Sequence, residues 1–287
     1  MASRVIKRLA RSVAPVWYER IRRGLAYRRR FSPEERRLHR AITARHRNVI
    51  AKLALQTDWC VQAGPFAGLR YPRSALRKQR MGHLLGSALA PKLLGSYEAE
   101  LHGVITAVAA REYAQVVDIG TGEGYYAVGL ARSMRSTLVY GFESSAEARR
   151  FCRRMAALNG VAGRVRVFGR ATTALLNSFL DGRSCFVLCD CEGCEVDLLD
   201  PETCPGLVKA DILVELHEHL RPGVTTMIEE RFKDTHSVQL IHECSRDPSS
   251  YSALFGCDNA ERELALREGR PAVMAWAWLR ALDGAAD

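Results

Sequence analysis

The chain has 287 residues, of which 47% are apolar and 26% charged, a balance typical of folded globular proteins. No run approaches the roughly 18 apolar residues that a membrane-spanning helix requires, so we expect no transmembrane segment. The net charge of +10 lies at the front: the first 50 residues hold fifteen basic and three acidic residues, and the remainder is nearly neutral. Because a nucleic-acid-binding domain usually carries its basic charge on the fold itself, this distribution makes nucleic acid an unlikely partner.

Residues 1–31 place apolar side chains at helical spacing, with arginines on the opposite side. This pattern predicts a basic amphipathic helix, which either packs on its own domain or contacts an anionic membrane surface or a protein partner. No apolar signal-peptide core follows it, and the cysteines are nine, an odd number. We therefore expect reduced thiols and a cytoplasmic location; an organelle transit peptide is the alternative for the arginine-rich start.

A second helix is predicted to begin at Ser32-Pro33-Glu34-Glu35, where a serine can cap the helix and proline suits its first position. Residues 59–72 are rich in glycine, proline and aromatics and predict turns or a short hairpin. Another helix is expected over 96–113. We interpret residues 1–92 as a basic, mainly helical extension or cap, and residues 93–287 as the main domain.

From residue 115 onward, short apolar runs alternate with amphipathic helices, the pattern of βαβ units and a parallel sheet. The predicted strands are seven: 115–119, 137–142, 165–168, 185–189, 212–216, 238–242 and 273–279. The helices between them, such as 146–159 and 225–233, are long enough for right-handed crossovers. The fold class is therefore α/β, with a Rossmann-like sheet and helices on both faces.

The first of these strands runs into a glycine-rich turn, Asp118-Ile119-Gly120-Thr121-Gly122-Glu123-Gly124. A dinucleotide-binding fingerprint has its third glycine one residue later, and an acid before the turn would repel a pyrophosphate. Asp118 would instead attract the sulfonium and amino groups of S-adenosylmethionine (SAM), while the glycines let the backbone approach the ligand. We assign Asp118, Gly120, Thr121, Gly122 and Gly124 to cofactor binding; a ligand-free structural turn is the alternative.

Glu143 follows the second strand, 23 residues after Gly120. Ligands of open α/β sheets bind at the carboxyl ends of the strands, and a carboxylate there can accept both ribose hydroxyls. We therefore predict Glu143, with the adjacent Ser144, as cofactor-binding residues. Taken alone, a glutamate after a strand is more often surface charge.

The fourth strand ends in Asp190-Cys191-Glu192-Gly193-Cys194-Glu195. The cysteines lack the paired spacing of a structural zinc or iron–sulfur site, so we interpret the thiols of this strand as core filling. Asp190 is expected to face the cleft, in contact with both cofactor and acceptor.

The fifth strand ends in Glu215, His217 and His219, which share one face if the strand extends that far. Histidine is a suitable general base near neutral pH, and we predict catalytic roles for these three and for Asp190. Exposed loop histidines are the alternative. A hard cation such as Mg2+, held by Asp190, Glu195, Glu215 and His217, is possible in principle, but we favour a site without metal.

At these motifs the sequence resembles the class I SAM-dependent methyltransferases and, within them, the FkbM family of O-methyltransferases. The resemblance covers roughly residues 95–220 and depends on the glycine turn, on Glu143, and on the acidic motif at 190–195 together with Glu215 and His217. It implies that the seventh strand is antiparallel. It also implies methyl transfer to a hydroxyl of a sugar, polyketide or similar natural product. The third strand lacks the acid that often binds adenine, so the backbone or Thr172 would take that contact.

Such an enzyme must mainly align the donor methyl and the acceptor oxygen while a base removes the hydroxyl proton. Three other functions compete with this hypothesis. They are methylation of RNA or DNA recruited by the basic arm, a non-catalytic cofactor-binding scaffold attached through that arm, and, more remotely, a dehydrogenase.

Overall fold

The computed structural model describes residues 32–78, 88–111, 113–180, 182–270 and 272–282, so the basic helix predicted at 1–31 lies outside the described residues. The chain forms two compact units, residues 1–48 and 49–287. Helix α3 (Pro33–Gln56) begins directly after Ser32, as its start signal predicts, and continues into the second unit. Among the described residues, no helix is long and apolar enough to cross a membrane.

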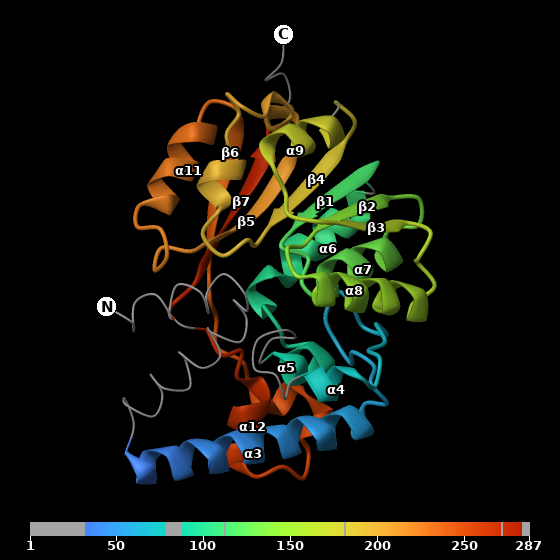
Figure 1. Cartoon of the computed structure of the whole chain (residues 1–287), viewed down its shortest axis with the longest axis vertical. Helices are drawn as coiled ribbons and strands as arrows, with labels where there is room; N and C mark the ends of the chain where they lie inside the picture. Colours follow the sequence, from blue (N-terminus) through green and yellow to red (C-terminus); the bar gives the residue numbers. More distant parts are fainter. Residues whose placement is uncertain (1–31, 79–87, 112, 181, 271, 283–287) are drawn as a thin grey trace, which may run out of the picture. The chain divides into compact units, whose positions relative to one another are not determined.

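The second unit contains a seven-stranded sheet with the order β3-β2-β1-β4-β5-β7-β6 (Figure 1). Its strands are β1 (Gln115–Ile119), β2 (Leu138–Phe142), β3 (Val165–Phe168), β4 (Cys185–Cys189), β5 (Asp211–Leu216), β6 (His236–His242) and β7 (Ala275–Ala281). Strands β1 to β5 pair in parallel, and β7 is antiparallel to both neighbours, β5 and β6. The predicted seven-stranded, mostly parallel sheet with an antiparallel last strand is confirmed.

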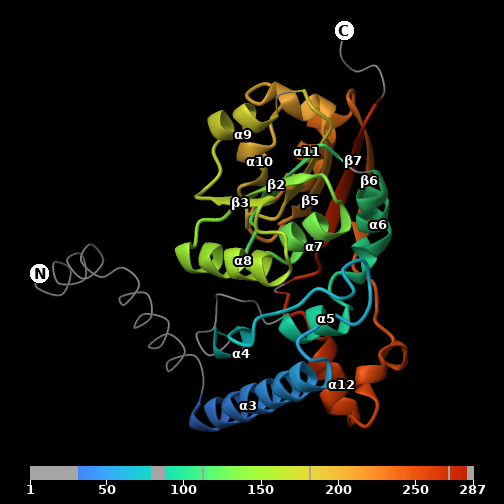
Figure 2. The same ribbon diagram turned by 90° about the vertical axis from the view of Figure 1, so that its right-hand side faces the viewer.

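Helices cover both faces of this sheet (Figures 1 and 2). One face packs on α6 (His102–Arg111), α7 (Tyr125–Ser133) and α8 (Ala146–Leu158), and the other on α9 (Thr173–Phe179), α10 (Glu195–Leu198) and α11 (Val224–Phe232). Successive residues of a strand point to opposite faces of the sheet. Val116 packs in the hydrophobic core with α6, α7 and α8, and Val117 packs in the core with α9, α10 and α11. This burial on both faces explains why the strands read as continuous apolar runs.

The segment before the sheet contains α4 (Ala75–Lys78), α5 (Leu89–Leu94) and the short η2 (Ala99–Leu101). The turn region predicted at 59–72 is present and is closed by an antiparallel bridge between Cys60 and Arg70. Phe66, from this turn, is buried and packs edge-on against Tyr125 of α7. Residues 49–75 thus share a hydrophobic core with the sheet. The domain boundary at residue 92 stays a prediction.

Two segments differ from the sequence-based expectation. The helix expected from residue 96 begins later, because Glu98 adopts a left-handed backbone (φ 48°) that interrupts the helical path before η2 and α6. Between β6 and β7 lies an additional helix, α12 (Asn259–Leu266), capped by Asp258 and Glu261 in a capping box. The remaining short helical turns are η3 (Pro205–Lys209), η4 (Pro248–Ser250) and η5 (Ser252–Leu254).

The direction in which the chain winds reverses between β1 and β4, which are neighbours in the sheet. In open α/β sheets, ligands bind outside the carboxyl ends of the strands at such a switch point. The carboxyl ends of β1, β2, β4 and β5 carry the predicted site residues, so the fold places them at one edge.

Candidate active site

A cavity of about 770 Å³ opens at the carboxyl ends of β1, β2 and β4. Acidic side chains outnumber basic ones on its walls. The acids are Asp118, Glu123, Glu143, Asp190, Glu192 and Asp197, and the bases are Lys92 and Arg170. The cavity is therefore suited to a cationic ligand and poorly suited to a phosphate group.

The glycine turn requires glycine for two separate reasons. Gly120 has φ 90°, and a Cβ there would lie 1.6 Å from the backbone oxygen of Asp190. Gly124 has φ 96° and begins α7, and a Cβ there would lie 2.6 Å from the Sγ of Cys152. A side chain at Gly120 would push the end of β1 away from the segment after β4, and one at Gly124 would push the start of α7 away from α8. The Thr121 hydroxyl closes the turn by donating a hydrogen bond of 2.9 Å to the backbone oxygen of Asp118.

Asp118 is 1% exposed and lies below this turn. Its carboxylate accepts a hydrogen bond from the Ala127 backbone N–H, while Oδ2 has no partner among the described residues. Burial, followed by the negative charges of Asp190 and Glu143, raises its pKa to about 8. A cation in the cavity would favour the ionised carboxylate.

Glu143 follows β2 on the far wall of the cavity. Its Oε2 accepts a hydrogen bond from the Gly122 N–H at 3.0 Å, and its Oε1 accepts one from the Ser145 N–H at 2.6 Å. These two contacts fix the carboxylate while leaving lone pairs for ligand hydroxyls. The exposed Ser144 also lines the cavity, and its hydroxyl lies 3.3 Å from the Glu143 carboxylate.

The end of β3 carries the residues predicted to face adenine. Arg170 and Ala171 line the cavity. Thr172 is the N-cap of α9, and its hydroxyl accepts a hydrogen bond from the Leu175 N–H at 3.3 Å. The structure therefore gives the Thr172 hydroxyl a capping contact, and a role in adenine binding stays a prediction.

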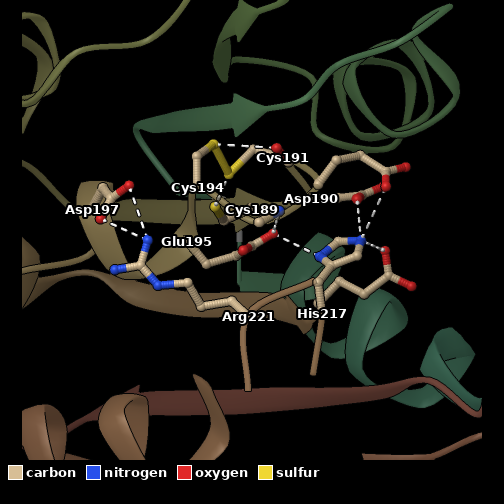
Figure 3. Close-up of a disulfide and its surroundings, with 11 residues drawn as sticks. Cys189, Asp190, Cys191, Cys194, Glu195, Asp197, His217 and Arg221 are labelled. Carbon is tan, nitrogen blue, oxygen red and sulfur yellow. Dashed lines mark hydrogen bonds and ion pairs between the residues drawn. A yellow bond between two sulfur atoms is a disulfide. The ribbon is translucent and has the colours of Figure 1, made fainter. Parts of the chain in front are cut away.

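Behind the cavity wall, His217 lies between the carboxylates of Asp190, just after β4, and Glu195, at the start of α10 (Figure 3). Its Nδ1 is 2.6 Å from Oε1 of Glu195. Its Nε2 faces the other way, at 3.3 Å from Oε2 of Glu215 and 3.6 Å from Oδ1 of Asp190. His217 is 2% exposed and Glu195 is fully buried. The structure thus brings together the four residues named from the sequence as alternative ligands of a hard cation, and their roles stay predictions.

The charges of this cluster are strongly coupled. Burial alone would lower the pKa of His217, but the Glu195 hydrogen bond and the charge of Asp190 raise it. Burial raises the pKa of Glu215, and the neighbouring Asp190 raises it further. Burial also raises the pKa of Asp190, although its contacts with Glu215 and His217 lower it in part.

The predicted catalytic residues differ in their access to the cavity. Asp190 lines it, whereas Glu215, His217 and His219 do not. His219 is exposed beyond the end of β5, with its ring centroid 5.8 Å from that of His217. Asp190 is therefore the member of this set that is open to the cavity, and His217 lies behind it.

The acidic motif contains a disulfide between Cys191 and Cys194 (Figure 3). This bond departs from the expectation that every thiol is reduced. The tight turn after β4 brings the two Cα atoms to 5.6 Å, a separation that suits a disulfide. Cys189, in contrast, is a buried free thiol and fills the core, as interpreted from the sequence.

Several cavity residues were not found from the sequence. Lys92 and Glu123 form an ion pair at 2.5 Å in the cavity wall. Tyr126, also in the wall, donates its hydroxyl hydrogen bond to Glu98. Glu123 stands inside the glycine motif and could have been singled out there, but its partner is 31 residues away along the chain.

No family model and no curated protein sequence matches the chain. Solved structures similar to it in fold include the O-methyltransferase TomG of Streptomyces achromogenes, crystallised with SAM (17% identity, TM-score 0.45, covering 72% of this chain and 86% of TomG). Another is an O-methyltransferase of Bacillus cereus with bound SAH (12%, 0.46, 72% and 88%). An rRNA methylase of Streptococcus thermophilus is similar as well (9%, 0.44, 64% and 97%). The similarity is one of fold alone.

Proposed function

We propose that the protein is a SAM-dependent methyltransferase that methylates a hydroxyl of a small acceptor such as a sugar or polyketide, as its FkbM-like motifs suggest. The observation that carries the proposal is the acidic, glycine-lined cavity at the switch point of the sheet. Asp118 lies there, buried, with one oxygen lacking a partner among the described residues.

The cavity residues divide into a binding set and a proton-handling set. Asp118 supplies the negative charge that a sulfonium or amino group requires, and Glu143 supplies a fixed carboxylate for ribose hydroxyls. SAM, when bound, supplies an electrophilic methyl group on a positively charged sulfur. The turn at Gly120 and Gly122 holds the backbone close to that ligand.

Asp190 would face the acceptor from the opposite wall of the cavity. As the acceptor oxygen gains the methyl group it loses its proton, and Asp190 is placed to receive it. Behind Asp190 lies His217, which Glu195 holds through Nδ1; its Nε2 is 3.6 Å from Asp190, and a protonated imidazole there would offset the charge of the ionised carboxylate. His217 is therefore a positioning residue in this proposal.

Methylation of nucleic acid is supported less well. The cavity walls carry six acids against two bases, and one of the bases, Lys92, is paired with Glu123. A nucleic-acid backbone entering this cavity would meet net repulsion. The basic residues 1–31, which would have to recruit such a substrate, lie outside the described residues.

Calorimetry with SAM and SAH tests the binding half of the proposal. Glu143→Gln changes the residue proposed to bind the ribose. It should weaken the binding of both SAM and SAH about tenfold or more, because hydrogen bonds to a charged group contribute roughly 1.5–3 kcal/mol. Glu202→Gln removes the same charge from an exposed turn outside the cavity and should leave both affinities unchanged. If neither ligand binds the folded wild-type protein, the proposal is wrong.

The transfer half is tested by SAH production with a panel of hydroxylated acceptors and, separately, with RNA. Asp190→Asn should abolish turnover while the protein still binds SAH. Product formed only with RNA would favour the nucleic-acid function, and SAH binding without turnover on any acceptor would favour a scaffold.

A further inference from the structure

We propose that Asp190, Glu192 and His217 form a binding site for one divalent transition-metal ion. The site itself is inferred from these side chains alone. What the ion would do, namely activate the acceptor hydroxyl, rests on the proposed methyltransferase function.

The three side chains converge although they come from two strands and a turn. Each offers one ligand atom, and the three atoms lie within 4.8 Å of one another. His217 Nε2 is 3.6 Å from Oδ1 of Asp190 and 3.8 Å from Oε2 of Glu192. Glu192 reaches this point through a left-handed backbone (φ 57°), which is uncommon for a residue other than glycine.

The imidazole is held in the way that metal-binding histidines are usually held. Glu195, fully buried, contacts Nδ1 of His217 at 2.6 Å. A carboxylate on one ring nitrogen fixes the ring and makes the other nitrogen a better ligand. Here the other nitrogen, Nε2, points to the carboxylate of Asp190 (Figure 3) and lies 3.8 Å from Oε2 of Glu192. The turn after β4 thus supplies two ligands and the carboxylate that orients the third.

A second, independent observation is the unsatisfied oxygen of Asp190. Its Oδ1 is enclosed and has no hydrogen-bond partner among the described residues. The nearest nitrogen, Nε2 of His217, is 3.6 Å away, which is too long for a hydrogen bond. A buried carboxylate oxygen without a partner is costly, and an ion between Asp190 and His217 would satisfy both atoms.

The charge balance of the cluster also favours a cation. Four carboxylates surround the imidazole, those of Asp190, Glu192, Glu195 and Glu215. Of these, Glu215 also contacts a guanidinium, that of Arg270, at 3.5 Å. A divalent ion would offset the remaining negative charge.

The ligand set selects the kind of ion. One imidazole and two carboxylates suit Mn2+, Fe2+, Co2+ or Zn2+, whereas Mg2+ prefers oxygen ligands throughout. Asp190 and Glu192 line the cavity, so water or an acceptor hydroxyl could complete the coordination from that side. A hydroxyl bound there would be polarised for loss of its proton.

Manganese titration followed by electron paramagnetic resonance tests this site without any acceptor, because bound Mn2+ loses the signal of the free ion. The wild-type full chain should bind one Mn2+. Glu192→Gln, at a side chain that is 77% exposed and not needed for folding, should weaken binding strongly, and His217→Ala should abolish it. Glu195→Gln should weaken it about 10- to 100-fold, the usual effect of removing a carboxylate that orients a metal-binding histidine.

Two control variants separate this site from its surroundings. Asp197→Asn removes a nearby cavity-wall acid that pairs with Arg221 and should leave Mn2+ affinity unchanged. Cys191→Ser combined with Cys194→Ser should also leave it unchanged. Absence of Mn2+ binding to wild type, equal binding by Glu192→Gln, or loss of binding in the cysteine variant would each overturn the inference. SAH calorimetry on the same samples distinguishes failure of the metal site from failure of the cofactor site.

Discussion

Two groups of carboxylates lie near the carboxyl edge of the sheet, and they differ in their partners. The first group contacts the guanidinium groups of Arg246 and Arg270, and its members are Glu98, Glu100, Glu215 and Glu268. The second group lines or underlies the cavity, and its members are Asp118, Glu143, Asp190 and Glu195. Within this second group, Asp190 and Glu195 form ion pairs with His217.

We infer a structural role for the carboxylates that are paired with arginine and a ligand-binding role for those at the cavity. Paired charges hold segments together: Arg270 joins the start of the sheet domain to the end of β5 and the segment before β7. Carboxylates whose oxygens lack partners, such as those of Asp118 and Asp190, raise the energy of the ligand-free fold. A protein that retains them has a use for negative charge there. Removing a cation from the first group and adding one to the second should therefore have opposite effects on stability.

The largest effect should come from Arg270→Met. Arg270 contacts Glu268 at 2.9 Å, Glu100 at 3.1 Å and Glu98 at 3.4 Å. Its loss removes a positive charge that compensates these enclosed carboxylates. Urea denaturation should show a loss of about 3–5 kcal/mol in the free energy of unfolding. Arg280→Met, on the exposed face of β7, should change it by less than about 0.5 kcal/mol. A loss below about 1 kcal/mol for Arg270→Met would contradict the structural role of the paired group.

Gly120→Ala should cause a smaller loss in the free energy of unfolding, and Gly160→Ala is its matched control. Both glycines have positive φ, 90° and 72°, but a Cβ at Gly160 meets nothing within 4 Å whereas one at Gly120 meets the Asp190 backbone. Gly160→Ala should cost about 1–2 kcal/mol, the usual penalty of a left-handed alanine. Gly120→Ala should cost more and should also abolish SAM binding in calorimetry. Equal losses with binding retained would show that the turn tolerates a wider separation of β1 and β4.

The third effect is a pH dependence of SAM affinity, and it concerns Asp118 of the second group. Because the pKa of Asp118 is about 8, its carboxyl is largely protonated at pH 6 and ionised at pH 9. A cationic ligand binds the ionised form, so SAM affinity should rise up to about tenfold per pH unit below pH 8 and level off above it. The folded protein also retains a proton that the unfolded chain releases above about pH 4, so this group lowers stability as pH rises from about 4 to 8.

Asp118→Asn is the variant that checks this origin. It should remove the pH dependence of SAM affinity between pH 6 and 8 and weaken binding at pH 8. If the slope persists in the variant, another group titrates on cofactor binding, and the charge of Asp118 is not what the ligand requires.

The sequence was sufficient for the features that depend on local pattern. Five of the seven strands, β1 to β5, begin within one residue of their predicted starts and end where predicted, because apolar runs of this length mark buried strands. Of these, β1, β3 and β4 match at both ends. The position of Glu143 followed from the rule that parallel strands share one edge. The glycine turn was equally readable, since its positive φ angles admit little else.

Contacts between distant segments could not be read in this way. The Arg270 cluster joins residues up to 172 positions apart, and Lys92 reaches Glu123 from a separate helix. The arrangement at the end of β5 was also hidden: the expectation that Glu215, His217 and His219 share one strand face required a strand that continues past Leu216, where β5 ends. Nor could the sequence show that Asp190 lines the cavity whereas these three residues do not. These arrangements depend on how whole elements pack.

The smallest expected effect, Thr172→Val, tests a residue for which the sequence and the structure suggest different uses. As the N-cap of α9, its hydroxyl accepts the Leu175 N–H, and loss of such a cap costs about 0.5–2 kcal/mol. We expect that loss in urea denaturation, with the dissociation constant for SAM unchanged. Weaker SAM binding at unchanged stability would instead make Thr172 an adenine ligand and extend the cofactor site to the end of β3. Because valine keeps the shape of threonine, either result isolates the hydroxyl oxygen itself.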